Sequence, residues 1–116
     1  MNLAELATLI EGTLTGSATA GPRDVGGGYV SDLLSDVMAN AQDGDAWITM
    51  QKHVNTVAVA QLKNLAVIVI VNGRQPEPDT VARAAEHGVS VVLTPLAAFD
   101  AAGRLYEAGL RGRRAP

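Results

Sequence analysis

The 116-residue chain contains no cysteine, which excludes disulfide bonds, thiolate catalysis and metal sites built on thiolates. Only four residues are aromatic, so the core of a domain this long has to be mainly aliphatic. No uninterrupted apolar run approaches the roughly 18 residues of a membrane helix, and the first residues lack the pattern of a signal peptide. We therefore expect a cytoplasmic protein that makes no membrane contact.

Positive charge is scarce outside the last six residues. The net charge is −3, but Arg111, Arg113 and Arg114 supply three of the nine cations, so residues 1–110 carry six cations against twelve anions. An acidic body disfavours nucleic-acid binding, which depends on neutralising phosphates. We expect residues 1–110 to form a single domain. Residues 111–116 are predicted to be a basic, disordered tail, either solvated or in contact with an anionic partner.

Helical and strand patterns alternate from residue 45 onward. The predicted elements are a strand in DAWITM (45–50), a helix in NTVAVAQLKN (55–64), a buried strand in LAVIVIV (65–71), a helix capped by Asp79 and stopped by Gly88, a strand in VSVVL (89–93) and a last helix opened by Thr94 and Pro95. Residues 2–11 and 31–41 also read as helices, the second capped by Ser31 or Asp32. Residues 13–16 read as an edge strand, and a further strand surrounds the triple glycine at 26–28.

Alternation of strands and helices with short connections implies parallel strands joined by right-handed crossovers. The predicted fold is therefore one compact α/β domain with a mostly parallel sheet flanked by helices. Ligands of such sheets sit beyond the carboxyl ends of the strands. The loops that leave those ends are where a binding site is expected.

The polar patch 51–55 lies between a predicted strand and a predicted helix. Free N–H groups at a helix start favour an anion, Lys52 adds positive charge, His53 can donate a hydrogen bond, and Asn55 is the expected helix cap. The patch is interpreted either as a site for a small anion or nucleotide phosphate, or as a helix start whose Lys52 and His53 face water.

Two further loops offer comparable sites. The triple glycine lets a ligand approach the backbone, but it matches no phosphate-binding loop and is more often a bulge or a tight packing point. Arg74 follows the buried strand, either as a clamp for phosphate or carboxylate or as an exposed loop residue. The candidate ligand-binding residues are Gly26, Gly27, Gly28, Ser31, Asp32, Gln51, Lys52, His53, Asn55, Gly73 and Arg74, and we expect them on one rim of the molecule.

The sequence gives little support for catalysis. Two histidines and scattered carboxylates match no metal-binding or nucleophile–base spacing, and His87 precedes Gly88 at a helix end, where the helix dipole favours a cation. We expect no catalytic residue, no metal and no cofactor. A minimal phosphotransferase that uses His53 or Asp32 is a third, weaker interpretation.

The run GGYVSDLLSDVMANAQDGDAWITMQKHVNTVAVAQLKNLAVIVIVNGRQP, followed by VVLTPLAAFDAAGRLYEAGL, resembles the DRTGG domain family over nearly the whole chain. That family is similar to the N-terminal domain of HPr kinase/phosphorylase, and the resemblance implies an α/β fold of that kind. The kinase activity does not transfer, because the chain lacks that enzyme's phosphate-binding loop. Residues 23–27 read Arg-Asp-Val-Gly-Gly, so the letters that name the family are not reproduced.

The resemblance implies regulation, since such modules accompany CBS domains in pyrophosphatases controlled by adenine nucleotides and precede phosphotransacetylase catalytic domains. Our leading hypothesis is a non-enzymatic regulatory domain that binds a small anionic metabolite or nucleotide and acts as a homodimer or through a partner enzyme. The alternative is a ligand-free interaction subunit of a metabolic or redox complex.

Overall fold

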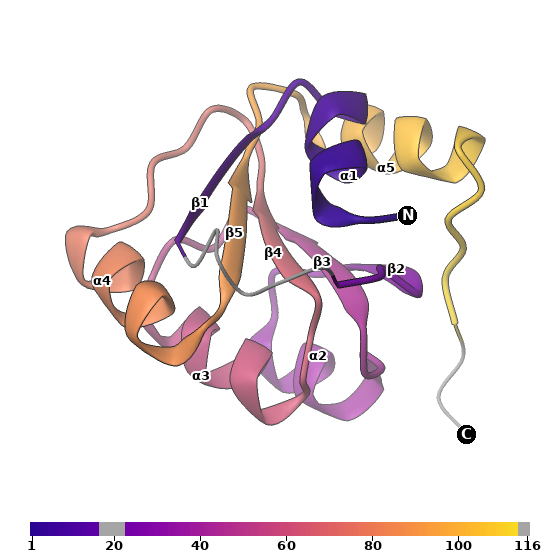
Figure 1. Ribbon diagram of the computed structural model, residues 1–116. Coiled ribbons are helices and arrows are strands. Elements are labelled where there is room, and N and C mark those ends of the chain that lie inside the picture. Colours follow the sequence, from indigo (N-terminus) through magenta and orange to yellow (C-terminus); the bar gives the residue numbers. More distant parts are fainter. Residues whose placement is uncertain (17–22, 114–116) are drawn as a thin grey trace.

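Helices and strands alternate through residues 1–16 and 23–113, the part of the chain that the computed structural model describes (Figure 1). In chain order the elements are α1 (Leu3–Leu9), β1 (Thr13–Gly16), β2 (Gly27–Val30), α2 (Leu34–Asn40), β3 (Asp45–Thr49), α3 (Asn55–Leu62), β4 (Val67–Ile70), α4 (Pro78–His87), β5 (Ser90–Leu93) and α5 (Ala98–Glu107). Each stretch that the sequence predicts as helix or strand contains one. None of the helices in these ranges has the length and apolar character needed to cross a membrane.

The strands form one sheet in the order β1-β5-β4-β3-β2. Strands β2 to β5 are parallel, and each pairs with the next along the chain, whereas β1 joins the outer side of β5 in the antiparallel sense. Every residue of β4 is buried, because a parallel strand in the middle of a covered sheet has no solvent-facing side. The predicted α/β fold with a mostly parallel sheet is confirmed.

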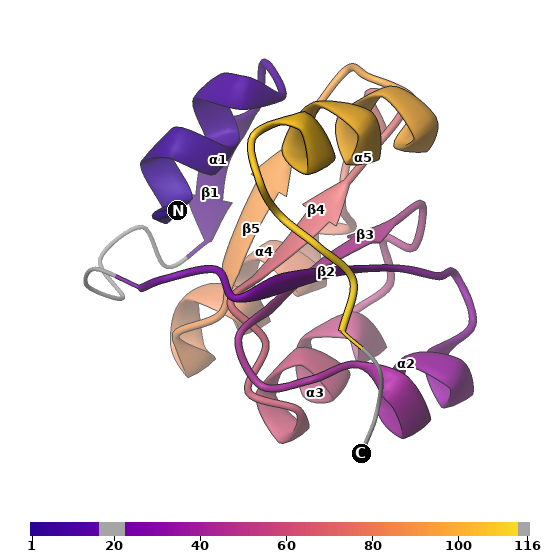
Figure 2. The same ribbon diagram turned by 90° about the vertical axis from the view of Figure 1, so that its right-hand side faces the viewer.

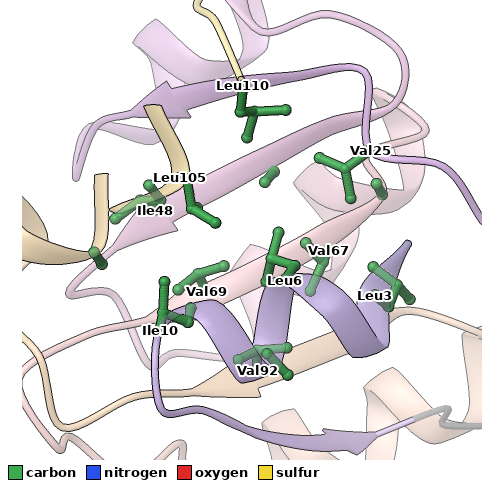
Figure 3. Packing of buried hydrophobic residues seen from close by; sticks show 14 of the residues in the cluster. Leu3, Leu6, Ile10, Val25, Ile48, Val67, Val69, Val92, Leu105 and Leu110 are labelled. Atoms are coloured by element: carbon green, nitrogen blue, oxygen red, sulfur yellow. The ribbon is translucent and has the colours of Figure 1, made fainter. Parts of the chain in front are cut away.

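Helices cover both faces of this sheet. Helices α2, α3 and α4 lie on one face, and α1 and α5 lie side by side on the other (Figures 1 and 2). Alternate residues of β3 divide between the two faces, since Ile48 packs under α1 and α5 while Trp47 packs with α2 and α3. Figure 3 shows Leu6 and Ile10 of the α1 region directed at Val69 and Val92 of the sheet.

The caps predicted for α2, α4 and α5 are wrong. Asp79 does not cap α4, which begins one residue earlier at Pro78 and has no side-chain cap, so Asp79 lies in its first turn. Neither Ser31 nor Asp32 caps α2, which begins at Leu34 without a side-chain cap. Thr94 does not cap α5, because its buried hydroxyl donates to the carbonyl of Ile10 at 2.6 Å and the helix begins only at Ala98. Asp32 and Thr94 instead form hydrogen bonds with residues that are distant in the sequence, Asp32 with Thr49 and Met50 and Thr94 with Ile10. The predicted stop at Gly88 is confirmed, with a left-handed φ of 68°.

The segment after α5 also differs from the expected disordered tail. Leu110 is buried in the core beneath α1 and α5, and the carbonyl of Arg111 accepts a hydrogen bond of 3.0 Å from the N–H of Gly28. Arg113 forms an ion pair with the buried carboxylate of Asp45. We call residues Leu110–Arg113 the C-terminal strap. The remaining residues of the predicted tail, 114–116, lie outside the described part of the chain.

Candidate functional site

A cleft of about 300 Å³ opens beyond the carboxyl ends of β3 and β4. Its lining combines residues from three loops: Asp32, Met50, Gln51, Lys52, His53, Arg74 and Glu77. We call it the carboxyl-end cleft. The sheet places these residues together because β2, β3 and β4 are adjacent and parallel, so the loops that follow them leave the same edge. Five of the predicted site residues meet here.

Asp32 and Gln51 join two of the loops. One oxygen of Asp32, Oδ1, accepts a hydrogen bond from the hydroxyl of Thr49 at 2.8 Å and another from the N–H of Met50 at 2.7 Å. The amide nitrogen of Gln51 donates to the carbonyl of Asp32 at 2.9 Å. These bonds fix the loop after β2 to the loop after β3. They leave the second carboxylate oxygen of Asp32 without a hydrogen bond from the described residues.

His53, rather than Asn55, organises the start of α3. The ring nitrogen Nδ1 of His53 accepts a hydrogen bond of 3.2 Å from the N–H of Asn55, and the carbonyl of His53 accepts from the N–H and the hydroxyl of Thr56. The predicted role of Asn55 as the cap is therefore wrong. In a neutral imidazole whose Nδ1 is an acceptor, the proton sits on Nε2. That nitrogen makes no hydrogen bond with the described residues, so it can donate to a bound molecule.

The two cations of the cleft have no charged partner. The backbone of Lys52 is fixed, because its carbonyl accepts hydrogen bonds from the N–H of Glu77 and the hydroxyl of Thr80. The ammonium of Lys52 and the guanidinium of Arg74 form neither hydrogen bonds nor ion pairs within residues 1–16 and 23–113. The opposing charges in the lining are Asp32 and Glu77. The cleft thus presents unpaired positive groups beside carboxylate oxygens.

The triple glycine does not reach this cleft. Gly27 begins β2 and pairs with Asp45, the first residue of β3, so Gly26 and Gly27 lie at the amino ends of the strands. A Cβ on Gly27 would lie 2.6 Å from the Nε atom of Arg113, and a Cβ on Gly26 would lie 3.1 Å from a guanidinium nitrogen of Arg113. The expectation that Gly26, Gly27 and Gly28 share a rim with Gln51 is wrong. Gly26 and Gly27 make room for Arg113 of the chain's own C-terminal strap.

Three other predicted residues lie near the cleft without lining it. Gly73 adopts a left-handed φ of 65°, and its N–H donates to the carbonyl of Thr94 at 2.9 Å, so it serves the turn after β4. The hydroxyl of Ser31 accepts from the N–H of Leu33. Asn55 lines a separate depression between α3 and α4.

Two lining residues, Met50 and Glu77, were not predicted. Met50 directly follows β3, and its position at a strand's carboxyl end was the available signal. Glu77 lies immediately before α4, and nothing local distinguishes it from its neighbours. Within the described ranges, no three histidine or acidic residues are grouped so that they could hold a metal ion.

Among the described residues, the two groups whose pKa is displaced, Tyr29 and Asp36, belong to a cluster between β2 and α2. Hydrogen bonds from Ser31, Tyr29 and Asn40 hold the pKa of Asp36 below its usual value. The hydrogen bond to Asp36, together with burial, raises the pKa of Tyr29 above its usual value. The Tyr29 hydroxyl lies 2.8 Å from each carboxylate oxygen of Asp36, so this cluster ties α2 to the sheet.

The fold is DRTGG-like, as the sequence predicts. The chain is similar in structure to the CBS and DRTGG domains of the regulatory region of Clostridium perfringens pyrophosphatase, complexed with the activator diadenosine tetraphosphate, with a TM-score of 0.72 at 14% sequence identity. The match covers 89% of this chain and 45% of that chain. No family model and no curated protein matches the sequence. The similarity to HPr kinase/phosphorylase stays a prediction.

Proposed function

We propose that the chain is a regulatory domain that binds a small anionic ligand of the nucleotide class in the carboxyl-end cleft. The unpaired cations of Lys52 and Arg74 carry the proposal, because a charged side chain without a partner gains most from an anion that reaches it. The Nε2 atom of His53 adds a hydrogen-bond donor beside them. The free oxygen of Asp32 provides an acceptor that suits a hydroxyl group of the same ligand.

The structural neighbour supports this class of ligand. Its regulatory region is complexed with a dinucleotide activator, and the domain pair that it contains is a regulatory unit of an enzyme. We infer a regulatory role for the present chain from the shared fold together with the cleft. We do not carry over the neighbour's binding residues, since 14% identity supports the fold alone.

A non-enzymatic role fits the chemistry of the cleft. Catalysis by a nucleophile needs a base within hydrogen-bond reach and a group that orients the base. The Nδ1 atom of His53 is taken by the N–H of Asn55, and Oδ1 of Asp32 is taken by Thr49 and Met50. Because Nδ1 of His53 accepts a hydrogen bond, its free Nε2 is a donor rather than a base, which favours binding over turnover.

Isothermal titration calorimetry with adenine nucleotides, pyrophosphate and acetyl phosphate tests the proposal. We expect one of these anions to bind the wild-type chain, and Lys52→Ala or Arg74→Ala to weaken its binding about 10- to 100-fold, which corresponds to about 1.5–3 kcal/mol for a lost charged hydrogen bond. Lys63→Ala is the matched control, because Lys63 also removes one cation but lies at the far end of α3. Equal weakening by all three substitutions, or no binding of any anion, would refute a specific site.

A regulatory domain has to pass the effect of ligand binding to another protein or to a second copy of itself. One exposed surface on α5 favours such contacts. Phe99 of α5 is 87% exposed and Tyr106 is 57% exposed. Exposed aromatic side chains of this kind are typical of protein interfaces. If no anion binds, this surface supports the second candidate function, a ligand-free interaction subunit. Light scattering of wild-type and Phe99→Ala chains then tests for a homodimer, and affinity capture with both chains tests for a partner that depends on Phe99.

A further inference from the structure

The C-terminal strap passes round the open edge of β2, from one face of the sheet to the other (Figure 2). Leu110 packs on the face that α1 and α5 cover. Arg111 crosses the edge, where its carbonyl accepts the N–H of Gly28. Arg113 reaches Asp45, which points to the opposite face because it alternates with Ala46 along β3. Four residues thus make contacts on both sides of the edge strand.

The end of the strap occupies a built socket for a guanidinium group. The side chain of Asp45 is 1% exposed, and its Oδ1 atom accepts a hydrogen bond of 3.0 Å from Nε of Arg113 and a second one from Nη2. Nη2 also donates to the carbonyl of Asp43 at 2.6 Å. Side chains at Gly26 and Gly27 would fill the space that the guanidinium uses. A buried carboxylate, a carbonyl and two glycines therefore define the arginine socket.

The strap leaves part of its surroundings unfilled. A cavity of about 240 Å³ adjoins it between α5 and β2, lined mainly by apolar side chains such as Val30, Ile48, Ala102 and Leu105. The chain's own residues before Leu110 do not continue the strap as an extended segment into this cavity. They turn at Gly109, where φ is 109°, and lead back to α5. A peptide that is not attached to α5 is free of this restriction.

We propose that the arginine socket and the adjoining cavity form a recognition site for an extended peptide of the type apolar–Leu–x–Gly–Arg from a partner protein. In the isolated domain the C-terminal strap is its intramolecular occupant. The partner's peptide displaces the strap, pairs its arginine with Asp45 and fills the cavity beside the leucine position. This site is separate from the carboxyl-end cleft, and it gives the domain a way to bind a partner.

The chemistry of the socket selects arginine. Leaving the buried carboxylate of Asp45 without a cation costs free energy, so either the strap or a competing peptide fills the socket. Lysine offers no planar group that can donate from Nε and Nη2 while lying against two glycines. A competing peptide has to displace the strap, which is tethered beside the socket and has an effective concentration of about millimolar order. Displacement consequently requires a peptide that gains additional contacts, and the open cavity offers them.

Calorimetric titration of the full-length Arg113→Ala chain tests this proposal. The probe is the synthetic peptide Ala-Leu-Leu-Arg-Gly-Arg, which is the sequence of residues 108–113 with leucine in place of Gly109, so that it carries the apolar residue expected to fill the cavity. A second peptide carries alanine in place of the last arginine. We expect the first peptide to bind the Arg113→Ala chain at least tenfold more tightly than it binds the wild-type chain, whose own strap competes. We expect the second peptide to bind at least tenfold more weakly than the first.

Gly27→Ala is the matched control. Its Cβ occupies the space of the Nε atom, so it also expels the strap but blocks the socket, and we expect no peptide binding. Equal binding of both peptides, or binding to the Gly27→Ala chain, would show general attraction of basic peptides to an acidic domain and would overturn the proposal. A folded Arg113→Ala chain that binds neither peptide would also overturn the proposal. So would an Arg113→Ala chain that forms dimers without peptide, because the occupant of the groove would then be a second copy of the chain.

If a variant fails to fold, a second measurement on the wild-type chain tests the same proposal. Isotope-labelled wild-type protein is titrated with the unlabelled peptide and followed by two-dimensional NMR. We expect the amide signal of Gly112 to move to the position of unstructured chain while the indole signal of Trp47 stays, because only the strap leaves. A Gly112 signal that does not respond to a large excess of peptide contradicts the proposal.

Discussion

Gly27 and Arg113 should be energetically coupled, although they are far apart in the sequence. A Cβ at Gly27 would lie 2.6 Å from Nε of Arg113, 2.7 Å from Oδ1 of Asp45 and 3.0 Å from the carbonyl of Arg111. Two of these three atoms belong to backbone or to a fixed buried carboxylate, so the arginine has to leave. Gly27→Ala and Arg113→Ala therefore remove the same interaction by different routes.

The structure sets the size of the effect. Removing one partner of a buried ion pair costs about 3–5 kcal/mol. The side chain of Arg113 is 38% exposed, so solvent screens part of the interaction and we expect about 2–3 kcal/mol for either substitution. The double variant should lose about 2–3 kcal/mol rather than the sum of roughly 4–6 kcal/mol, because the second change removes nothing further.

Urea denaturation followed by the fluorescence of Trp47 measures these free energies. With a slope of roughly 1–3 kcal/mol per molar urea, each single substitution should lower the midpoint by roughly 1–2 M. Gly103→Ala is the control, since nothing lies within 4 Å of a Cβ there and an alanine inside α5 should stabilise the chain by about 0.5–1 kcal/mol. Additive losses in the double variant would refute the reasoning, as would a Gly27→Ala chain as stable as the wild type.

Three further predictions concern single groups. Thr94→Val should destabilise the chain by about 1–3 kcal/mol, because it leaves the buried carbonyl of Ile10 without a donor, and Thr94→Ser should restore most of the loss in the same denaturation assay. Gly88→Ala should cost about 1–2 kcal/mol from backbone strain alone, since φ is 68° and no atom lies within 4 Å of the new Cβ; an unchanged unfolding midpoint would contradict this. Because the pKa of Asp36 is lowered on folding, its contribution is present above the ordinary value of 3.8 and is lost as the pH falls through the lowered value. The difference in thermal midpoint between wild type and Asp36→Asn should therefore shrink below about pH 4, and a constant difference would contradict the assignment.

Most of the fold could be predicted from local sequence patterns. The run of residues 65–71 is buried throughout, as its β-branched composition predicts, and the alternation of strands and helices was sufficient to predict a parallel sheet. Residue spacing at loop ends was sufficient to bring Asp32, Lys52 and Arg74 to one cleft. These predictions succeeded because they depend on periodicity and on the shared direction of neighbouring strands.

The missed features depend on contacts between distant residues. Local sequence makes Thr94 a helix cap, but Ile10 on α1's side of the sheet offers its hydroxyl a buried acceptor. The triple glycine has the composition of a ligand loop, whereas the group that it accommodates is Arg113. Nothing near position 27 encodes that partner, so only the folded arrangement identifies it. The ligand-binding role of the cleft residues remains a prediction that the titrations test.

The placement of β1 has a consequence for the order in which the chain becomes stable. Strands β2 to β5 pair with sequence neighbours, so each can join the sheet soon after the ribosome releases it, but β1 pairs only with β5. During synthesis the apolar side of α1, with Leu3 and Leu6, therefore stays incompletely covered until β5 and α5, which contribute Val92 and Leu105 to the same cluster, have emerged. The amino-terminal residues are made first and gain their native surroundings among the last, and this interval is when a nascent chain of this fold is most exposed to chaperones.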